Sequence, residues 1–422
     1  MSDIVRTMRA YEILDSRGNP TIAVKVDLQS GVSGWARVPS GASTGAHEAV
    51  ELRDGGTRYQ GKGVQNACRN INEIIGPALV GMPVEAQWRI DQLLRDLDGD
   101  PQKARLGANA VLGVSLAVLN AAAASLSVPL YRYIGGTNAR LLPVPLLNVV
   151  NGGVHADNNV DIQEFMLVPA GARTFAEAMR MASETYHALK SLMQERGLRT
   201  AVGDEGGFAP DLNDDREVLD FLVQAIEKAG LKPGQDMALA LDVAANELLT
   251  PQGYRLSGQI RTVDQLVAFY QEILDNYPVI SIEDGLAEDD WDGWHYLQQE
   301  LGGRAQLIGD DLFVTNPTRI LKGMEQQSAN AVLIKLNQIG TVSETLEAIR
   351  LSQAHGWHTI VSHRSGETED TSIADLSVAM NTGQLKTGAP ARSERVAKYN
   401  RLIIMEAEDA QLEYAGWGAF GR

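Results

Sequence analysis

The first third of this chain shows two successive patterns of hydrophobic and polar residues. Between residues 4 and 38, apolar positions such as Ile22 and Val24 alternate with polar ones, which is typical of strands with one buried face. A turn cluster at 15–20 separates the expected strands. From residue 63 to 128 the spacing changes and predicts helices. The apolar face expected near the start of this helical region comprises Ile71, Ile74, Ile75 and Leu79.

One segment inside the helical region needs a separate interpretation. Val111 to Leu130 carries no charged residue and is long enough to span a membrane. However, it contains the polar residues Ser115 and Asn120, and much of its apolar content is alanine. We therefore expect a buried helix in the core of a soluble domain.

A glycine-rich stretch at 135–138, followed by Pro143 and Pro145, predicts a linker between two domains. We place an N-terminal domain at residues 1–136 and a C-terminal domain at residues 137–422.

In the C-terminal part, short apolar runs alternate with helical segments. Such continuous aliphatic runs suit parallel strands that are buried on both faces. Two of the helices are expected to begin at capping boxes, formed by Thr174 with Glu177 and by Thr341 with Glu344. This regular alternation fits a closed parallel barrel of the α/β class better than an open sheet. The runs are Met237–Leu241, Val279–Ile282, Ala305–Ile308, Ala331–Ile334 and His358–Val361.

The overall charge limits the partners of the protein. There are 37 basic and 54 acidic side chains, which gives a net charge of −17. A chain this acidic is a poor general binder of nucleic acid or of anionic membranes, so we expect neither as a partner. The single cysteine, Cys68, excludes an internal disulfide and fits a reducing cytosol. The first residues lack the continuous apolar core of a signal peptide, so we expect a cytoplasmic protein.

Ionisable residues follow the five predicted apolar runs and a sixth, shorter run at Gln384-Leu385. Barrel enzymes place their active sites at the C-terminal ends of the strands, so this set predicts one active site. Ordinary polarity at strand ends would explain a single case but not six in succession. The six ends carry Asp242, Glu283, Asp310, Lys335, Arg364 with Ser365, and Lys386.

The carboxylates and cations of this set suggest different tasks. Asp242, Glu283 and Asp310 are hard oxygen ligands without His or Cys nearby, which favours Mg²⁺ over Zn²⁺. We expect these three to converge without a cation of their own. The three cations at the same mouth suit a phosphorylated or carboxylated substrate; they are Lys335, Arg364 and Lys386.

Three loops supply further candidates, each with a plainer alternative. Glu205 lies between glycines, either at a catalytic turn or in an ordinary connection from a helix to a strand. His155 is either a ligand or a structural histidine, and it lies near the first barrel strands together with Gln163 and Glu164. The glycine- and hydroxyl-rich loop that starts at Ser40 is either a mobile lid or a plain turn.

These motifs together resemble the enolase family, the phosphopyruvate hydratases, over the full length of the chain. No catalytic residue of the family pattern is missing, and Gly285 is typical of bacterial members. The motifs are Ser-Gly-Ala-Ser-Thr-Gly at 40–45, Asn-Gly-Gly-Val-His-Ala at 151–156, Gly-Asp-Glu-Gly-Gly at 203–207, Ser-Ile-Glu-Asp at 281–284, Gly-Asp-Asp-Leu at 309–312, Leu-Ile-Lys-Leu-Asn-Gln-Ile-Gly-Thr at 333–341 and Ser-His-Arg-Ser-Gly-Glu-Thr at 362–368.

The resemblance implies a fold and a reaction. The fold is an α+β cap domain followed by an eight-stranded barrel of ββαα(βα)6 type. The reaction is the interconversion of 2-phosphoglycerate with phosphoenolpyruvate and water, in a homodimer or an octamer. Family members also occur at cell surfaces or in RNA-processing complexes, but nothing in this sequence encodes such a role.

The resemblance also assigns roles to residues. Lys335 becomes the base, with a pKa expected to be lowered by adjacent cations, and Glu205 becomes the acid, protonated or sharing a proton with Glu164. Two Mg²⁺ ions per site are implied, the first on Asp242, Glu283 and Asp310, the second with Ser40 as a ligand. The implied substrate contacts are His155, Gln163, Arg364, Ser365 and Lys386.

Two alternatives remain open from the sequence. One is another lyase or racemase of the same superfamily that acts on a carboxylic acid without phosphate. The other is a non-catalytic interaction protein built on the same barrel.

Overall fold

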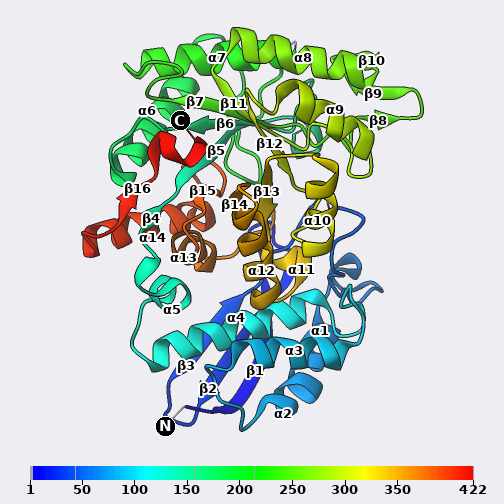
Figure 1. Cartoon of the computed structure of the whole chain (residues 1–422), viewed down its shortest axis with the longest axis vertical. Helices are drawn as coiled ribbons and strands as arrows, with labels where there is room; N and C mark the ends of the chain where they lie inside the picture. Colours follow the sequence, from blue (N-terminus) through cyan, green and yellow to red (C-terminus); the bar gives the residue numbers. More distant parts are fainter. Residues whose placement is uncertain (1–2, 43, 157, 213, 422) are drawn as a thin grey trace.

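The computed structural model describes residues 3–42, 44–156, 158–212 and 214–421 (Figure 1). Ser43, in the predicted lid loop, lies outside the described residues. The first third of the chain forms a small sheet covered by helices, and the rest forms a closed barrel of eight strands. This is the α/β architecture, with an α+β cap, that the sequence predicts.

The N-terminal sheet consists of three antiparallel strands in the order β1 (Val5–Leu14), β2 (Pro20–Leu28) and β3 (Ser33–Arg37). The turn between the first two strands is closed by Asp15, whose carboxylate accepts backbone N–H groups from Arg17 and Asn19 over 2.8 and 2.9 Å. Gly18 in this turn has φ of +77°, a conformation that favours glycine.

Helices cover one face of this sheet. The expected apolar face is correct for Ile71, Ile75 and Leu79, which are fully buried, but wrong for Ile74, which is 42% exposed. The reason is a turn of π-helix at Ile71–Ile75, which changes the angular spacing of the side chains. The helices are α1 (Gln65–Asn70), α2 (Gly76–Leu79), α3 (Gln87–Asp98), α4 (Ala108–Ser125) and α5 (Leu130–Gly135), with a 3₁₀ turn at Arg58–Gly61.

The long uncharged segment forms α4, as a core helix. By length and composition it could cross a membrane, but 83% of it is buried inside the protein. It packs closely on the sheet because the contact residues are small. A Cβ atom added to Gly34 would collide with the backbone of Ala117 and Ala121 on α4. The prediction of a buried helix is therefore confirmed.

The barrel strands coincide with the predicted apolar runs. Seven of them run in the same direction, and β6 runs antiparallel to both of its neighbours. The strands are β5 (Val144–Asn151), β6 (Glu164–Val168), β7 (Ala238–Asp242), β11 (Val279–Glu283), β12 (Gln306–Gly309), β13 (Ala331–Ile334), β14 (His358–Ser362) and β15 (Gly383–Lys386). Their order around the barrel is β11-β12-β13-β14-β15-β5-β6-β7. We call the end at which the seven parallel strands finish the mouth, and the opposite end the floor.

Helices surround the barrel. They are α6 (Phe175–Glu195), α7 (Asp215–Lys228), α8 (Val263–Asn276), α9 (Trp291–Leu301), α10 (Pro317–Gln326), α11 (Leu336–Ile339), α12 (Val342–Ala354), α13 (Ser372–Ala379) and α14 (Ser393–Glu408). A small sheet of β8 (Leu249–Thr250), β9 (Gly253–Leu256) and β10 (Gln259–Arg261) precedes α8. A pair of short strands, β4 (Leu141–Leu142) and β16 (Glu413–Tyr414), joins the C-terminal segment to the linker side.

The helix caps differ in detail from the prediction. Thr174 and Thr341 do accept the N–H groups of Glu177 and Glu344, over 3.0 and 3.2 Å. The reciprocal half of each box is absent, since Glu177 accepts from Arg173 and Glu344 accepts from the hydroxyl of Thr341. A complete capping box begins α8 instead, between Thr262 and Gln265. In the sequence, the indication of this capping box is Gln265, which lies three residues after the N-cap residue Thr262.

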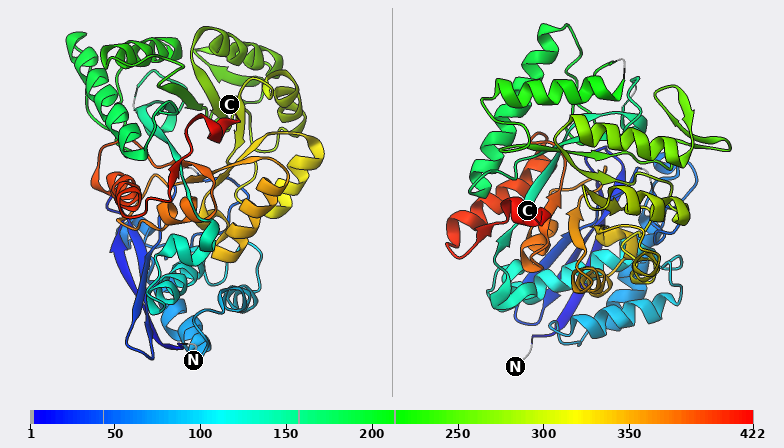
Figure 2. Two further views of the ribbon diagram at one scale, coloured as in Figure 1. Left: turned by 60° about the vertical axis from the view of Figure 1, so that its left-hand side comes forward. Right: turned by 45° about the horizontal axis from the view of Figure 1, so that its top comes forward.

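The N-terminal layer lies against one side of the barrel, where α3 and α4 meet α11 and α12 (Figure 2). We propose a domain boundary between residues 136 and 137, after α5. The predicted linker is shorter than expected, because Pro145 already belongs to the barrel strand β5.

Candidate active site

Opposite charges occupy opposite sides of the barrel mouth. Four carboxylates lie at the mouth ends of the neighbouring strands β6, β7, β11 and β12, and we call them the acidic arc: Glu164, Asp242, Glu283 and Asp310. Three cations lie at or just after the mouth ends of β13, β14 and β15, and we call them the basic arc: Lys335, Arg364 and Lys386. All seven side chains are buried or nearly so.

Glu164 joins the acidic arc because β6 is reversed. As the first residue of an antiparallel strand, it lies directly opposite Asp242, the last residue of β7. If β6 were parallel to its neighbours, its first residue, Glu164, would lie at the floor and not at the mouth.

Lys386 connects the two arcs. Its ammonium group lies 2.8 Å from Oδ2 of Asp242, 2.8 Å from Oε1 of Glu283 and 3.1 Å from Oε2 of Glu164. Burial would lower the pKa of Lys386, but these carboxylates outweigh it and raise the pKa well above its ordinary value. The expectation that the carboxylates converge without a cation of their own is therefore wrong.

Lys335 also pairs with the acidic arc. Its Nζ lies 2.5 Å from Oδ2 of Asp310, while Oδ1 of Asp310 accepts from the amide of Gln338 over 2.8 Å. Burial and the nearby Arg364 act to lower the pKa of Lys335, as expected from the sequence. Asp310 acts in the opposite direction and prevails, so the pKa of Lys335 is raised. In this arrangement the ammonium form is favoured.

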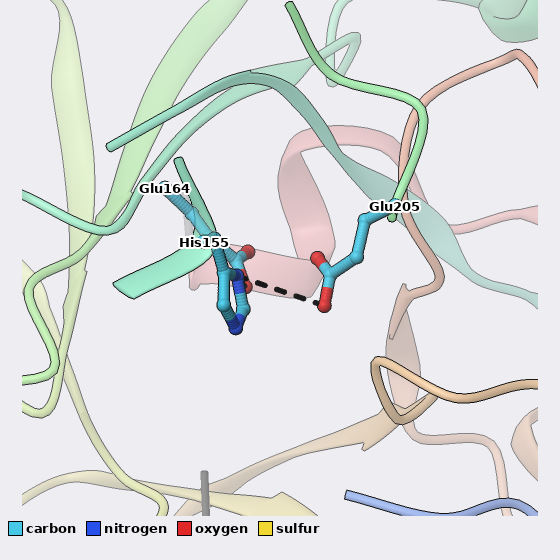
Figure 3. Close-up of side chains that lie close together, drawn as sticks. All are labelled: His155, Glu164 and Glu205. Atoms are coloured by element: carbon cyan, nitrogen blue, oxygen red, sulfur yellow. Dashed lines mark ion pairs between the residues drawn. The ribbon is translucent and has the colours of Figure 1, made fainter. Parts of the chain in front are cut away.

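Across the mouth, His155, Glu164 and Glu205 form a compact group (Figure 3). Their nearest ligand atoms all lie within 4.8 Å of one another, and Nδ1 of His155 is 3.8 Å from Glu164 and 3.9 Å from Glu205. Burial, and then the charge of Glu205, raise the pKa of Glu164 well above normal. A raised pKa of Glu164 beside Glu205 favours a proton shared between the two carboxyl groups.

The pKa of Glu205 is shifted in the opposite direction. Burial acts to raise it, but His363, which presents its Nε2 to the carboxylate, together with His155 and Arg395, outweighs burial and holds the pKa well below normal. Asn148 also donates to Oε2 of Glu205 over 3.0 Å. Glu205 lies on a loop between α6 and α7, so the alternative of a connection from a helix to a strand is wrong.

His363 was not among the site residues predicted from the sequence, although it lies beside Arg364 in the same motif. Its Nδ1 must accept a hydrogen bond, because Nη1 of Arg395 donates to it over 2.5 Å. The proton of the neutral ring therefore resides on Nε2, which faces Oε2 of Glu205 at 3.5 Å. Burial lowers the pKa of His363 well below normal and keeps the ring neutral.

The cavity at the mouth is small. It has a volume of about 30 Å³, room for about one water molecule, and ten of the predicted site residues line it together with Ser362 and His363. The predicted ones are His155, Gln163, Glu164, Glu205, Asp242, Asp310, Lys335, Arg364, Ser365 and Lys386. This volume is too small for a substrate with a phosphate and a carboxylate group, so binding requires the cavity to widen. A cleft of about 420 Å³ under the Ser40 loop adjoins this cavity and also reaches Arg364.

Glu283 and Ser40 are the two predicted site residues outside the cavity lining. Glu283 is fully buried behind Lys386. The hydroxyl of Ser40 lies 3.0 Å from Oε2 of Glu51 and 2.9 Å from Nη2 of Arg53. The backbone of Ser40 exchanges two hydrogen bonds with Gly366, so this end of the loop is fixed to the barrel.

The acidic arc fits an oxygen-preferring divalent cation. Oε2 of Glu283 is buried, and among the described residues it has no hydrogen-bond partner. Burial and the neighbouring Asp242 raise the pKa of Glu283 well above normal, because the arc holds more carboxylates than the lysines neutralise. Mg²⁺ suits such a set of hard donors. Asp284 is a less suitable ligand, since both of its carboxylate oxygens accept backbone N–H groups, from Asp310 and Asp311.

A barrel whose mouth joins an acidic arc suited to a divalent cation, a facing basic arc and a pair of neighbouring carboxyl groups is typical of a barrel enzyme that acts on an anionic substrate. Comparisons with known proteins narrow this class. The model of the enolase N-terminal domain matches residues 5–134, and that of the enolase C-terminal TIM barrel domain matches residues 139–420. A curated relative, enolase of Acidothermus cellulolyticus, is 58% identical over 420 residues, which cover 99% of this chain and 98% of the relative.

The chain belongs to the enolase family. Its reaction is the reversible dehydration of 2-phosphoglycerate to phosphoenolpyruvate in glycolysis, and the enzyme is a hydro-lyase. The family depends on Mg²⁺, and the described residues of this chain include acidic clusters that could hold a metal ion.

Proposed function

We propose that the chain catalyses this reaction with Lys335 as the base and the Glu205–Glu164 pair as the acid. The observation that carries the proposal is their placement. Lys335 follows β13 and Glu164 begins β6, and these strands are four apart in either direction around the barrel. A substrate held between them would meet a base on one side and a proton donor on the other.

The bond changes follow from these roles. Nζ of Lys335 takes the proton from C2 of 2-phosphoglycerate. The electron pair left on C2 then forms the C2–C3 double bond as the hydroxyl group leaves C3. That hydroxyl departs as water with the proton held by the carboxyl pair, delivered by Glu205. His363, through its Nε2–H, keeps Glu205 oriented.

Lys335 needs to be neutral before it can act as a base. Asp310 is the group that holds its proton in this structure, so neutralisation of Asp310 lowers the pKa of Lys335 toward the working range. When bound, Mg²⁺ supplies positive charge that stabilises the negative charge developing on the substrate carboxylate. We propose two Mg²⁺ ions per active site, one held by Asp242, Glu283 and Asp310 and the other with Ser40 among its ligands.

We propose that the substrate anion contacts the basic arc and its neighbours. These residues combine charge, hydrogen-bond donors and burial around the cavity. They are His155, Gln163, Arg364, Ser365 and Lys386. Gln163 supports a contact with the substrate because its buried Oε1 has no hydrogen-bond partner among the described residues and is available to accept from the substrate hydroxyl group.

A coupled assay for phosphoenolpyruvate tests the proposed function. We expect turnover of 2-phosphoglycerate with Mg²⁺, loss of turnover with EDTA and recovery when Mg²⁺ is restored. Turnover of a non-phosphorylated carboxylic acid instead would favour a different lyase or racemase of the superfamily, and no turnover at all would favour a non-catalytic role.

Calorimetric titration with Mg²⁺ tests the metal site without reference to activity. Glu283→Gln removes a charged oxygen from the centre of the arc, so we expect Mg²⁺ affinity to fall about tenfold or more. Asp289→Asn, an exposed acid on the loop after the same strand, is the matched control and should bind Mg²⁺ like the wild type. Equal affinity in both variants would remove Glu283 from the metal site.

We also propose assembly into a homodimer or octamer in the cytoplasm, without nucleic acid or membrane partners. Light scattering of the purified protein distinguishes a monomer from either assembly, and cell fractionation tests the location.

A further inference from the structure

A carboxylate from the N-terminal domain holds Arg364. Nη1 of Arg364 donates to Oε2 of Glu48 over 3.0 Å, and Nη2 donates to Oε1 over 3.1 Å. Both side chains are almost fully enclosed, with exposed fractions of 3% for Arg364 and 8% for Glu48. Two parallel hydrogen bonds of this kind fix the plane of a guanidinium group as well as its position.

We propose that Glu48 is a positioning residue that directs Arg364 toward the phosphate of the substrate. The proposal rests on the proposed role of Arg364 in substrate binding. A free arginine side chain loses rotamer entropy when it is fixed in one geometry. Glu48 removes that cost before the substrate arrives, which is the general advantage of a preorganised site.

The surroundings of Glu48 show that it is part of a rigid support. Its Oε1 also accepts from the backbone N–H of Gly45 over 3.2 Å and from the amide of Gln338 over 3.3 Å. Ala49, the next residue, donates its N–H to the backbone oxygen of Gln338 over 2.8 Å. Asn337 accepts from Nη1 of Arg364 over 2.9 Å and limits the guanidinium further.

These contacts also argue against a competing role. A mobile carboxylate could act as a substitute for the substrate anion and leave Arg364 when phosphate binds. Glu48 is instead tied to the loop and to the barrel by donors other than Arg364. Its loss would leave a buried guanidinium without its carboxylate, which is costly. Positioning and substitution predict opposite changes in phosphate affinity, so one experiment separates them.

The test compares Glu48→Gln, Glu48→Asp and the matched control Glu288→Gln in the full-length protein. Glu288 also supports this loop, since its Oε2 accepts the N–H of Ala46 over 3.0 Å, and its described contacts do not include Arg364. The primary measurement is the affinity for inorganic phosphate by calorimetry. The second is the separation of kcat from KM for 2-phosphoglycerate.

We expect Glu48→Gln to weaken phosphate binding and raise KM about tenfold or more, with a much smaller change in kcat. Glu48→Asp keeps the charge and should restore part of the affinity, whereas Glu288→Gln should stay close to the wild type. In an Arg364→Gln background, Glu48→Gln should have little further effect on affinity, because it acts through Arg364.

Unchanged or tighter phosphate binding in Glu48→Gln overturns the proposal, and so does an equal loss in the Arg364→Gln background. The proposed function is tested separately. A wild-type protein that makes phosphoenolpyruvate while Glu48→Gln binds phosphate normally refutes only the positioning role. A wild type without turnover, in which phosphate affinity still depends on Glu48, refutes only the proposed function.

Discussion

At the residue scale, the charged side chains of the active site pair with one another, and these pairs set the pKa values of the proposed catalytic groups. Lys335 is paired with Asp310, which raises the pKa of the lysine, and the pKa of Glu164 is raised beside Glu205. The proposed base thus starts in a setting that favours its ammonium form, and the pKa of the proposed acid, Glu205, is lowered. Both proposed roles require a change of partner when substrate and metal bind.

Proton exchange separates these two roles. Lys335→Ala should lose both phosphoenolpyruvate formation and the exchange of the C2 proton with solvent deuterium, because the C2 proton then has no acceptor. Glu205→Gln should lose product formation yet keep the exchange, because removal of the C2 proton remains possible. We expect each loss of turnover to reach about 10²–10⁴-fold. NMR of 2-phosphoglycerate in deuterated water measures the exchange.

The reverse pattern, with exchange kept in Lys335→Ala and lost in Glu205→Gln, would exchange the two assignments. Glu288→Gln serves as the control variant, since its carboxylate contacts the loop backbone rather than the cavity.

At the element scale, a carboxylate of one domain caps a helix of the other. Oδ2 of Asp91 on α3 accepts the N–H of Ser343 in the first turn of α12 over 2.9 Å. Oδ1 of Asp91 accepts from Ser115 on α4 over 2.7 Å and from Gln87 over 3.0 Å. The start of α12 is therefore satisfied by groups more than two hundred residues away in the sequence.

Asp91→Ala should destabilise the protein by about 2–4 kcal/mol, because it leaves several buried donors without an acceptor. Urea unfolding measures the change. Asp91→Asn keeps an acceptor oxygen in nearly the same volume and should lose less. An alanine variant as stable as the wild type would show that this cap contributes little.

A polar layer near the barrel floor gives a dependence on pH. Nδ1 of His358 is 2.9 Å from Oε1 of Gln306, which also accepts from Gln384 over 2.8 Å. Burial lowers the pKa of His358 below its ordinary value. A depressed pKa means that the contribution of this histidine is present above about pH 6.5 and is lost as the pH falls below it.

We therefore expect the free energy of unfolding to decrease between pH 7.5 and pH 5.5, and the decrease to be smaller in His358→Asn. The asparagine keeps an N–H donor but does not titrate. Urea unfolding of both proteins at the two pH values isolates the histidine, because the other groups contribute equally. The same decrease in both would exclude His358 as its source.

Site residues could be predicted from the sequence where a regular structural pattern, such as the ends of parallel strands, brings them together in space. Asp242, Glu283, Asp310, Lys335 and Lys386 were predicted because parallel strands bring their ends to one rim. Interactions across the domains were not accessible in this way. The pairing of Arg364 with Glu48 joins residues 316 positions apart.

A local departure from the α-helical spacing of side chains was also not predicted from the sequence. A π-turn exposes Ile74, and no residue type in that turn indicates a π-turn. The raised pKa values of Glu164 and Lys335 depend on distances between buried charges, which a sequence pattern does not contain.

At the scale of the whole molecule, the site is shared between the two domains. The barrel supplies both arcs, while the N-terminal domain supplies Ser40 and Glu48. Buried ionic contacts also cross the interface away from the site, since Lys103 lies 2.9 Å from Glu344 on α12 and is 2% exposed. Neither domain can leave the other without exposing buried charge.

We therefore expect both domains to unfold in one cooperative thermal transition. Differential scanning calorimetry should give a single peak with calorimetric and van't Hoff enthalpies in agreement, provided that the melt is reversible. Two resolved peaks would mean that the interface is weaker than its buried ion pairs indicate.

The reversed strand β6 has an evolutionary consequence. Because β6 ends at the floor, α6 returns the chain to the mouth and α7 then leads it back to the floor. Glu205 lies in the connection between these two helices. Its position is set by local contacts, such as the hydrogen bond from the hydroxyl of Tyr186 to the backbone oxygen of Gly206, and not by the register of a barrel strand. Replacement of this turn would alter how a leaving group is handled while the metal-binding strands keep their order. A lineage could thus acquire a new elimination or isomerisation by changing one connection, and the inherited ability to hold a carboxylate beside a cation would persist.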